Sequence, residues 1–388
     1  MIKFIDEVKI KNKTVLLRVD FNVSLNPNLT IADDVRIRQS LPTIEYLLKD
    51  NNKIIIIAHL NNPKKRDHTD SLIRVKSRLA EYLHTKKITF VEDFLKNPHT
   101  QNLKPGEILL FENIRFYPGE KKNDPEFAKQ LSVLGDVYVN DAFGVSHRKD
   151  ASLVGLPKFL PSYGGLLLKK EITMLSMLMK NPKKPFVAII GGKKITTKIK
   201  FIDKLETKAD FLLLGGGLAN TFVAAEGHGL GNSFMKKEDV VVAKHILSLA
   251  RKEHTRFVLP KDAVVAKGLD SKISEVKKIN EIDKKDHILD IGPETQAEFG
   301  KIIEEAGTIV WNGPVGYIEN PVFKRGTDFL YYSITENTKA ISIVGGGDTL
   351  AAIAKKEYLD KITHISTGGG AMLEFIENGT LPAIEALK

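Results

Sequence analysis

The sequence predicts an α/β protein with two doubly wound, Rossmann-like domains built on parallel sheets. Short apolar runs rich in β-branched residues alternate with helical patterns along almost the whole chain. Runs that are apolar on both faces are typical of parallel strands covered by helices on both sides. The length of 388 residues exceeds what one hydrophobic core usually serves, so two such sheets are expected.

The predicted strands follow one another at short intervals in both halves. In the first half they lie at 14–19, 53–58, 88–91, 107–111 and 136–139. In the second half they lie at 186–190, 211–214, 257–259, 288–291, 308–311, 340–344 and 363–366. Amphipathic stretches between them predict helices, for example at 34–48, 72–83 and 294–305.

A long helical pattern at 166–180 is the expected connector between the domains. It follows Gly164-Gly165 and ends before Asn181-Pro182, with Pro185 just beyond, which is a strong stop signal. We therefore expect a first domain at 1–168 and a second at 169–375, joined by this helix and a hinge.

Composition limits the classes of function. The chain has no cysteine, which excludes disulfides and thiolate metal sites, and its N-terminus lacks the apolar run of a signal peptide. The most apolar stretch, 211–225, is interrupted by three glycines and Asn220, so it predicts strand, loop and helix rather than a membrane span. We expect a cytoplasmic protein without a membrane partner.

The formal net charge of +10 comes mostly from scattered lysines. A solvated, lysine-rich surface explains this charge, and small anionic substrates fit in addition to it. No basic run is interleaved with aromatic residues, so nucleic acid is not an expected partner.

Polar residues follow the strands of the first half, at the end where ligands of parallel sheets bind. The strand ends carry Asp20-Phe21-Asn22, His59, Arg115 and His147-Arg148, and Arg36 opens the first helix. Each alone is better explained as a surface arginine or a hydrogen-bonded core histidine. Together they predict a site for a small polyanion, because the planar guanidinium suits carboxylate and phosphate.

Glycine follows the strands of the second half. The glycine turns are 191–194, 215–217, 312–316, 345–349 and 368–370. Glycine lets the backbone approach a ligand closely, and a helix that starts after such a turn offers free N–H groups to phosphate. Tight strand-to-helix turns would also explain one such turn. The repetition, with lysines in the first turn, predicts a nucleotide phosphate site.

Two acidic residues of this half have two interpretations each. Asp348 stands at a predicted helix start, where capping and magnesium binding are equally compatible with it. Glu319 could reach a ribose hydroxyl or lie in a solvated loop. The P-loop motif is absent, and the glycines at 227–231 follow a helix rather than a strand, so the dinucleotide fingerprint fails.

A polyanion site in one domain and a nucleotide site in the other suit phosphoryl transfer. This reaction needs alignment, neutralisation of charge and exclusion of water more than covalent help from the protein. Two domains that close on two substrates would meet these needs.

Six segments resemble successive signatures of the phosphoglycerate kinases, in the order of that family. They are LRVDFNV at 17–23, LFENIRFY at 110–117, NDAFGVSHR at 140–148, WNGPVG at 311–316, GGGDT at 345–349 and STGGG at 366–370. The resemblance implies transfer between ATP and 3-phosphoglycerate, with Mg2+ as the cofactor of the nucleotide, and a monomer. It also implies that the C-terminal segment, 376–388, returns to the first domain.

The resemblance assigns roles residue by residue. The positions that match 3-phosphoglycerate binding are Asp20, Phe21, Asn22, Arg36, His59, Leu60, Asn61, Asn62, Arg115 and Arg148. The positions that match nucleotide binding are Lys198, Gly215, Gly216, Asn312, Glu319, Gly346, Gly347, Asp348 and Thr349, with Asp348 as the magnesium ligand. The positions implied to act on the phosphoryl group in transfer are Arg36, Lys194, Gly368, Gly369 and Gly370.

Two segments depart from the family pattern. Where the family has SHLGRP, this chain has AHLNNP at 58–63, so Asn62 replaces a substrate arginine. Lys64, Lys65 and Arg66 follow and either compensate or lie on the solvated surface. Where the family has GGAKVSDK, this chain has GGKKITTK at 191–198, which changes the surroundings of Lys194 by adding Lys193 and Thr197. The alternative function is a nucleotide-binding relative whose acceptor site is weakened or altered at Asn62.

Overall fold

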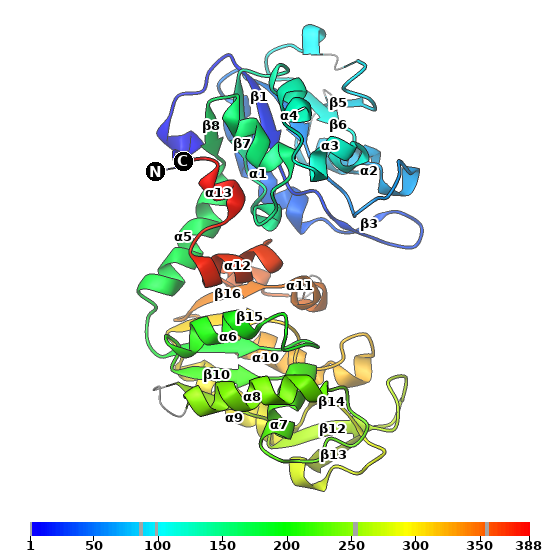
Figure 1. Cartoon of the computed structure of the whole chain (residues 1–388), viewed down its shortest axis with the longest axis vertical. Coiled ribbons are helices and arrows are strands. Elements are labelled where there is room, and N and C mark those ends of the chain that lie inside the picture. Colours follow the sequence, from blue (N-terminus) through cyan, green and yellow to red (C-terminus); the bar gives the residue numbers. More distant parts are fainter. Residues whose placement is uncertain (1, 85–87, 98–99, 251–254, 354–356) are drawn as a thin grey trace. The chain divides into compact units, whose positions relative to one another are not determined.

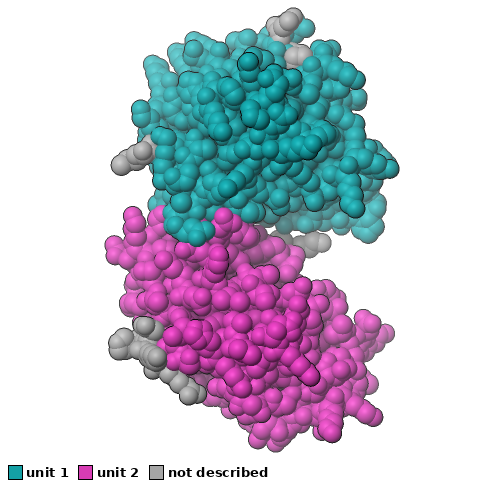
Figure 2. All heavy atoms as spheres, viewed as in Figure 1, with its two compact units in different colours: residues 1–173, 378–388 teal, residues 174–377 magenta. Residues whose placement is uncertain are grey.

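The computed structural model describes residues 2–84, 88–97, 100–250, 255–353 and 357–388. The chain forms two compact units (Figure 2). Unit 1 comprises Met1–Thr173 and Asn378–Lys388, and unit 2 comprises Met174–Glu377. The helix α5 (Leu166–Lys180), expected as the connector, runs from unit 1 into unit 2. Within the described ranges, no helix combines the length and the apolar character needed to cross a membrane.

The described part of unit 1 is built on a parallel sheet of six strands (Figure 1). Their order is β5 (Ile88–Val91), β6 (Ile108–Phe111), β4 (Lys53–Ile57), β1 (Thr14–Arg18), β7 (Val137–Asn140) and β8 (Ser162–Gly164). The five strands predicted in this half are confirmed. The chain winds outward from β1 in both directions, first through β4 and later through β7, so a ligand crevice is expected at the carboxyl ends of these central strands, and we call this region the crevice of unit 1.

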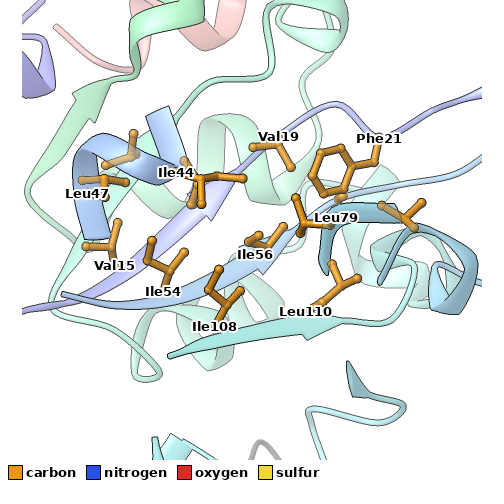
Figure 3. Packing of buried hydrophobic residues seen from close by; sticks show 14 of the residues in the cluster. Val15, Val19, Phe21, Ile44, Leu47, Ile54, Ile56, Leu79, Ile108 and Leu110 are labelled. Atoms are coloured by element: carbon orange, nitrogen blue, oxygen red, sulfur yellow. The ribbon is translucent and has the colours of Figure 1, made fainter. Parts of the chain in front are cut away.

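Helices of unit 1 cover the sheet, and the first two correspond to the amphipathic stretches predicted at 34–48 and 72–83. They are α1 (Val35–Leu48), α2 (Ile73–Tyr82), α3 (Pro118–Lys121) and α4 (Pro125–Ser132). Figure 3 shows side chains of α1 and α2, such as Ile44 and Leu79, packed against those of the central strands, such as Ile54 and Ile56. All four are fully buried, and each such side chain contributes about 1.5–3 kcal/mol by leaving water.

The last helix, α13 (Pro382–Glu385), belongs to unit 1. The Ala383 N–H donates to the Ser146 carbonyl oxygen over 3.0 Å. Ala383 is also fully buried in a small apolar cluster with Ala142 and Leu153. The chain therefore ends against the loop that follows β7, beside the crevice of unit 1.

The described part of unit 2 has a second parallel sheet of six strands. Their order is β11 (Arg256–Val258), β10 (Phe211–Leu214), β9 (Phe186–Ile190), β15 (Thr308–Asn312), β16 (Ile341–Gly345) and β17 (His364–Ile365). The helices of this unit are α6 (Ile199–Glu206), α7 (Gly216–Ala225), α8 (Lys237–Ala250), α9 (Pro293–Glu305), α10 (Arg325–Glu336), α11 (Gly347–Ile353) and α12 (Gly370–Asn378). The order reverses between β9 and β15, which places the glycine turns after these strands at the switch point.

One predicted strand lies in a different sheet. The run at 288–291 was expected in the parallel sheet, but it forms β14 (His287–Ile291), which pairs antiparallel with β12 (Asp262–Ala266). With β13 (Glu275–Lys278) these strands form a separate antiparallel sheet. An apolar run such as 288–291 does not show whether its strand pairs parallel or antiparallel, and β13 is mostly exposed and charged, so no apolar run marked this third sheet.

Candidate functional site

The crevice of unit 1 contains an ion pair that joins the end of β1 to the first turn of α1. Arg36 Nη1 lies 2.6 Å from Asp20 Oδ2, and the Asn22 N–H donates to Asp20 Oδ1 over 3.1 Å. Asp20 is buried, and burial alone would raise the pKa of its carboxyl. The opposing contributions, of which the charge of Arg36 is the largest, together outweigh burial, and the pKa of Asp20 falls to about 2. Asp20 is therefore ionised at neutral pH and fixes the guanidinium of Arg36.

His59 follows β4 and faces the same ion pair from the neighbouring strand. Its Nδ1 lies 3.9 Å from Asp20 Oδ1 and 3.4 Å from Arg18 Nη2. Burial lowers the pKa of His59 well below its usual value; Asp20 opposes this shift, while the surrounding arginines add to it. His59 is therefore neutral at pH 7, so it can offer a ligand a hydrogen bond but not a positive charge.

The loop after β4 is held in the crevice by hydrogen bonds to its backbone. The Asn61 N–H donates to Asn22 Oδ1 over 2.7 Å, and Asn113 Nδ2 donates to the Leu60 carbonyl over 2.7 Å. Arg115 Nη1 donates to the Asn61 carbonyl over 2.6 Å. Asn61 adopts a φ of 56°, a left-handed conformation that asparagine tolerates better than most residues. The path of this loop is thus set by residues that follow the two neighbouring strands, β1 and β6.

Arg115 has guanidinium donors that are buried and unpaired within the described part of the chain. Its side chain is 3% exposed, yet Nε and Nη2 have no hydrogen-bond partner among the described residues, and Nη2 lies 3.8 Å from Asp150 Oδ2. Burial and the nearby Arg148 and Arg18 lower the pKa of Arg115 to about 10, so the guanidinium stays charged at pH 7. A buried cation with free donors is suited to an anionic ligand, because leaving such donors unpaired is costly.

Two of the predicted substrate residues face the core instead of the crevice. The side chains of Phe21 and Leu60 are fully buried in the main apolar cluster of unit 1, where Figure 3 shows Phe21 near Leu79. They can offer a ligand only their backbone. Arg148 is exposed and His147 is half-buried in the loop after β7. The sequence could not separate these cases, because all of them lie in segments that follow strands.

Lys198 connects two glycine turns of unit 2. Its buried ammonium donates to the Gly191 carbonyl over 2.7 Å and to the Asn312 carbonyl over 3.0 Å. Burial lowers the pKa of Lys198 to about 8, against the opposing charge of Asp348. An ammonium has three donors, so one remains for a ligand. A Cβ on Gly313, whose φ is 96°, would lie 2.5 Å from Gly191 backbone atoms and 2.6 Å from Lys198 Nζ.

Asn312 and Thr349 hold the turn at 345–349 against the turn at 312–316. Asn312 Nδ2 donates to the Gly345 carbonyl over 3.1 Å, and the Gly313 N–H donates to Thr349 Oγ1 over 2.7 Å. Both side chains are buried, so their polar groups fix the loops. Gly346 adopts a φ of 106°, which favours glycine at this position.

These turns enclose a cavity of about 290 Å³, which we call the glycine cavity. Its lining includes most of the predicted nucleotide and phosphoryl-transfer positions, namely Lys194, Lys198, Asn312, Gly346, Gly347, Asp348, Thr349, Gly369 and Gly370. Gly215 and Gly368 are absent from the lining. Gly215 is a packing position, since a Cβ there would lie 2.4 Å from the Val315 side chain.

A second, largely apolar cavity of about 450 Å³ adjoins the glycine cavity and shares Lys193 and Asp348 with it. The predicted Gly216 and Glu319 line this apolar cavity. Sequence reasoning missed its apolar walls, which include Val223, Phe234, Leu289 and Tyr317. These residues come from separate segments without a shared motif, so no local pattern identifies them. Lys193 Nζ lies 4.7 Å above the ring of Phe234 at the boundary of the two cavities.

The shape and polarity of the two cavities fit the parts of a nucleotide. Apolar walls suit a base, and a glycine-lined cavity with lysines suits phosphates. The described residues contain no cluster of three or more His, Asp or Glu side chains that could hold a metal alone. Asp348 is exposed to the glycine cavity, and a single carboxylate beside phosphates is a common arrangement for Mg2+.

Comparisons with known proteins agree on one family. The sequence model described as phosphoglycerate kinase matches residues 5–379. A phosphoglycerate kinase of Dictyoglomus turgidum is 44% identical over 383 residues, which cover 98% of this chain and 96% of the relative. One from Moorella thermoacetica is 43% identical over 386 residues, with 98% of each chain covered.

Solved structures give the same result. The phosphoglycerate kinase of Coxiella burnetii is similar with a TM-score of 0.87 and 38% identity, covering 100% of this chain and 99% of that one. The phosphoglycerate kinase of Pyrococcus horikoshii has a TM-score of 0.88 at 33% identity, covering 99% of this chain and 98% of that one. The similarity therefore extends over both units.

Proposed function

Because the chain belongs to the phosphoglycerate kinase family, it is a kinase that transfers a phosphoryl group between ATP and 3-phosphoglycerate, and we propose that the two sites described above bind these substrates. The crevice of unit 1 takes 3-phosphoglycerate, and the two cavities of unit 2 take the nucleotide. The observation that carries this proposal is the glycine cavity, whose lining contains Lys194, Lys198 and Asp348.

In the crevice of unit 1, the charged groups of the acid would use contacts that the protein leaves open. Arg115 offers Nε and Nη2, and Arg148 lies exposed nearby. Arg36 is held by Asp20 but remains partly exposed, so it can face both its carboxylate partner and the reacting group. Neutral His59 and the amide of Asn22 add hydrogen bonds that orient the acid without further charge.

In unit 2, the base would occupy the apolar cavity and the phosphates the glycine cavity. The third hydrogen of the Lys198 ammonium is available to a phosphate oxygen. Lys194 and the backbone at the start of α12, Gly369 and Gly370, line the same cavity and would neutralise the charge that develops on the transferring group. Asp348 would hold Mg2+, which neutralises phosphate charge when bound.

Transfer requires the carboxylate of the acid to meet the terminal phosphate in line, with water excluded. We propose that binding of both substrates closes the two units about α5, and that the active protein is a monomer. Small-angle scattering with and without the two substrates tests closure, and light scattering measures the mass.

A coupled assay tests the assignment. Purified protein with ATP, Mg2+ and 3-phosphoglycerate should oxidise NADH through a dehydrogenase that consumes the product. Lys194→Ala is the matched variant, because Lys194 lines the glycine cavity with an exposed side chain, whose removal should leave the fold intact. A wild-type rate no higher than that of Lys194→Ala would contradict the proposal.

A further inference from the structure

Asn62, in the crevice of unit 1, is contacted by a lysine that is distant from it in the sequence. Lys121, the last residue of α3, donates a hydrogen bond from Nζ to Asn62 Oδ1. The two residues are separated by 59 positions in the chain. The contact arises because α3 follows β6, the immediate neighbour of β4 in the sheet. The ammonium of Lys121 therefore contacts Asn62, the residue that stands where the family has an arginine.

Lys121 and Arg115 lie against the same short loop. Arg115 Nη1 donates to the Asn61 carbonyl over 2.6 Å, and Lys121 donates to the side chain of the next residue, Asn62. Both cations keep donors that these bonds do not use: Nε and Nη2 of Arg115, and two of the three hydrogens of the Lys121 ammonium. Two cations therefore contact adjacent residues of this loop, a pattern suited to a doubly charged anion.

The carboxylate nearest to Lys121 in sequence does not neutralise it. Glu120 is fully buried and accepts hydrogen bonds from Ser152, through Oγ over 2.6 Å and through the backbone N–H over 2.9 Å. Lys121 itself is exposed. Its charge is therefore available to a ligand in solution.

Arg66, which follows Asn62 in the same loop, is less suited to binding an anion beside Asn62. Arg66 donates to the Glu92 carbonyl over 2.9 Å, and its guanidinium lies 5.1 Å from the ring centre of Phe116 and 5.4 Å from that of Tyr117. These contacts hold Arg66 away from Asn62. The hydrogen bond to Asn62 comes instead from Lys121.

We propose that Lys121 is a substrate-binding residue of the acid site, and that Asn62 positions its ammonium to contact an anionic group of 3-phosphoglycerate. The inference rests on the proposed function of the crevice. Asn62 accepts from the ammonium through its carbonyl oxygen and retains its own N–H2 group as a donor. The pair thus supplies the charge and the donors that a single arginine would supply at this position.

The experiment compares Lys121→Met with Lys122→Met, which removes an exposed lysine from the next position. A charge-assisted contact to an anion is worth roughly ten- to a hundred-fold in binding, so Lys121→Met should raise the KM for 3-phosphoglycerate by that factor. The kcat, the KM for ATP and the urea midpoint should stay unchanged, as should every parameter of Lys122→Met. Calorimetric titration with 3-phosphoglycerate alone should show the same loss of affinity.

A second pair of variants tests the partnership. Asn62→Arg combined with Lys121→Met should restore the KM, because the arginine brings the charge back to position 62. An unchanged KM in Lys121→Met, an equal effect of Lys122→Met, or no rescue by the arginine would overturn the inference while the wild type remains active. A wild type without turnover or binding of 3-phosphoglycerate would overturn the proposed function as well, so the two failures are distinguishable.

Discussion

Nucleotide binding should weaken above pH 8 because of one buried lysine. Burial lowers the pKa of Lys198 to about 8, and its ammonium donates to the carbonyls of Gly191 and Asn312 while facing the glycine cavity. If the phosphate binds only the ammonium form of Lys198, then only free protein with a protonated Lys198 binds ADP. The apparent Kd for ADP then grows as the charged fraction falls, by about tenfold between pH 7 and pH 9.

Calorimetry in buffers with different ionisation enthalpies measures both the affinity and the accompanying proton. At pH 8 the free lysine is about half protonated and the bound lysine fully so, which predicts an uptake of about half a proton on binding. Lys198→Arg is the matched control, since a guanidinium stays charged throughout this range and should give a flat profile. Equal affinity of the wild type at pH 7 and pH 9, or the same slope in Lys198→Arg, would refute the reasoning.

Three further predictions concern stability. Gly313→Ala should destabilise unit 2 by about 1–3 kcal/mol in urea unfolding, because the left-handed φ and the tight backbone contacts forbid a Cβ, whereas Gly268→Ala, which has open space, should be neutral. Arg36→Met should lower the free energy of unfolding at pH 7 by up to about 2 kcal/mol. The pKa of Asp20 is depressed to about 2 in the folded state, so this stabilisation is present above about pH 4 and is lost as pH falls through 2. The variant and the wild type should therefore have the same stability in acid. Burial raises the pKa of Asp290 to about 7, so the folded state binds an extra proton between about pH 4 and pH 7. The free energy of unfolding of the wild type should therefore fall as pH rises through this range, by at most about 1.4 kcal/mol per pH unit. Asp290→Asn should remove this slope, and an unchanged slope would contradict the assignment.

The strands and glycine turns were predictable because their causes are local. A strand covered on both faces must be apolar along its whole length, as 53–58 is, and a turn with positive φ, such as that at Gly313, requires glycine. Ligands bind at the carboxyl ends of parallel strands, and this rule alone assigns Asp20 and Arg115 to one crevice. The exposed strand β13 (Glu275–Lys278) carries no such pattern, and the sequence did not predict it for this reason.

The sequence by itself determined the family, the two sheets and the ends of the strands where ligands bind. Only the tertiary structure decided which neighbours along the chain face a ligand: Phe21 points into the core while Asp20 and Asn22 face the crevice. It also brought Lys121 to Asn62 and buried Lys198 between two turns. Hydrogen bonds and desolvation act between atoms in space, and residues that are distant in the chain become neighbours only after the sheet has placed their strands side by side.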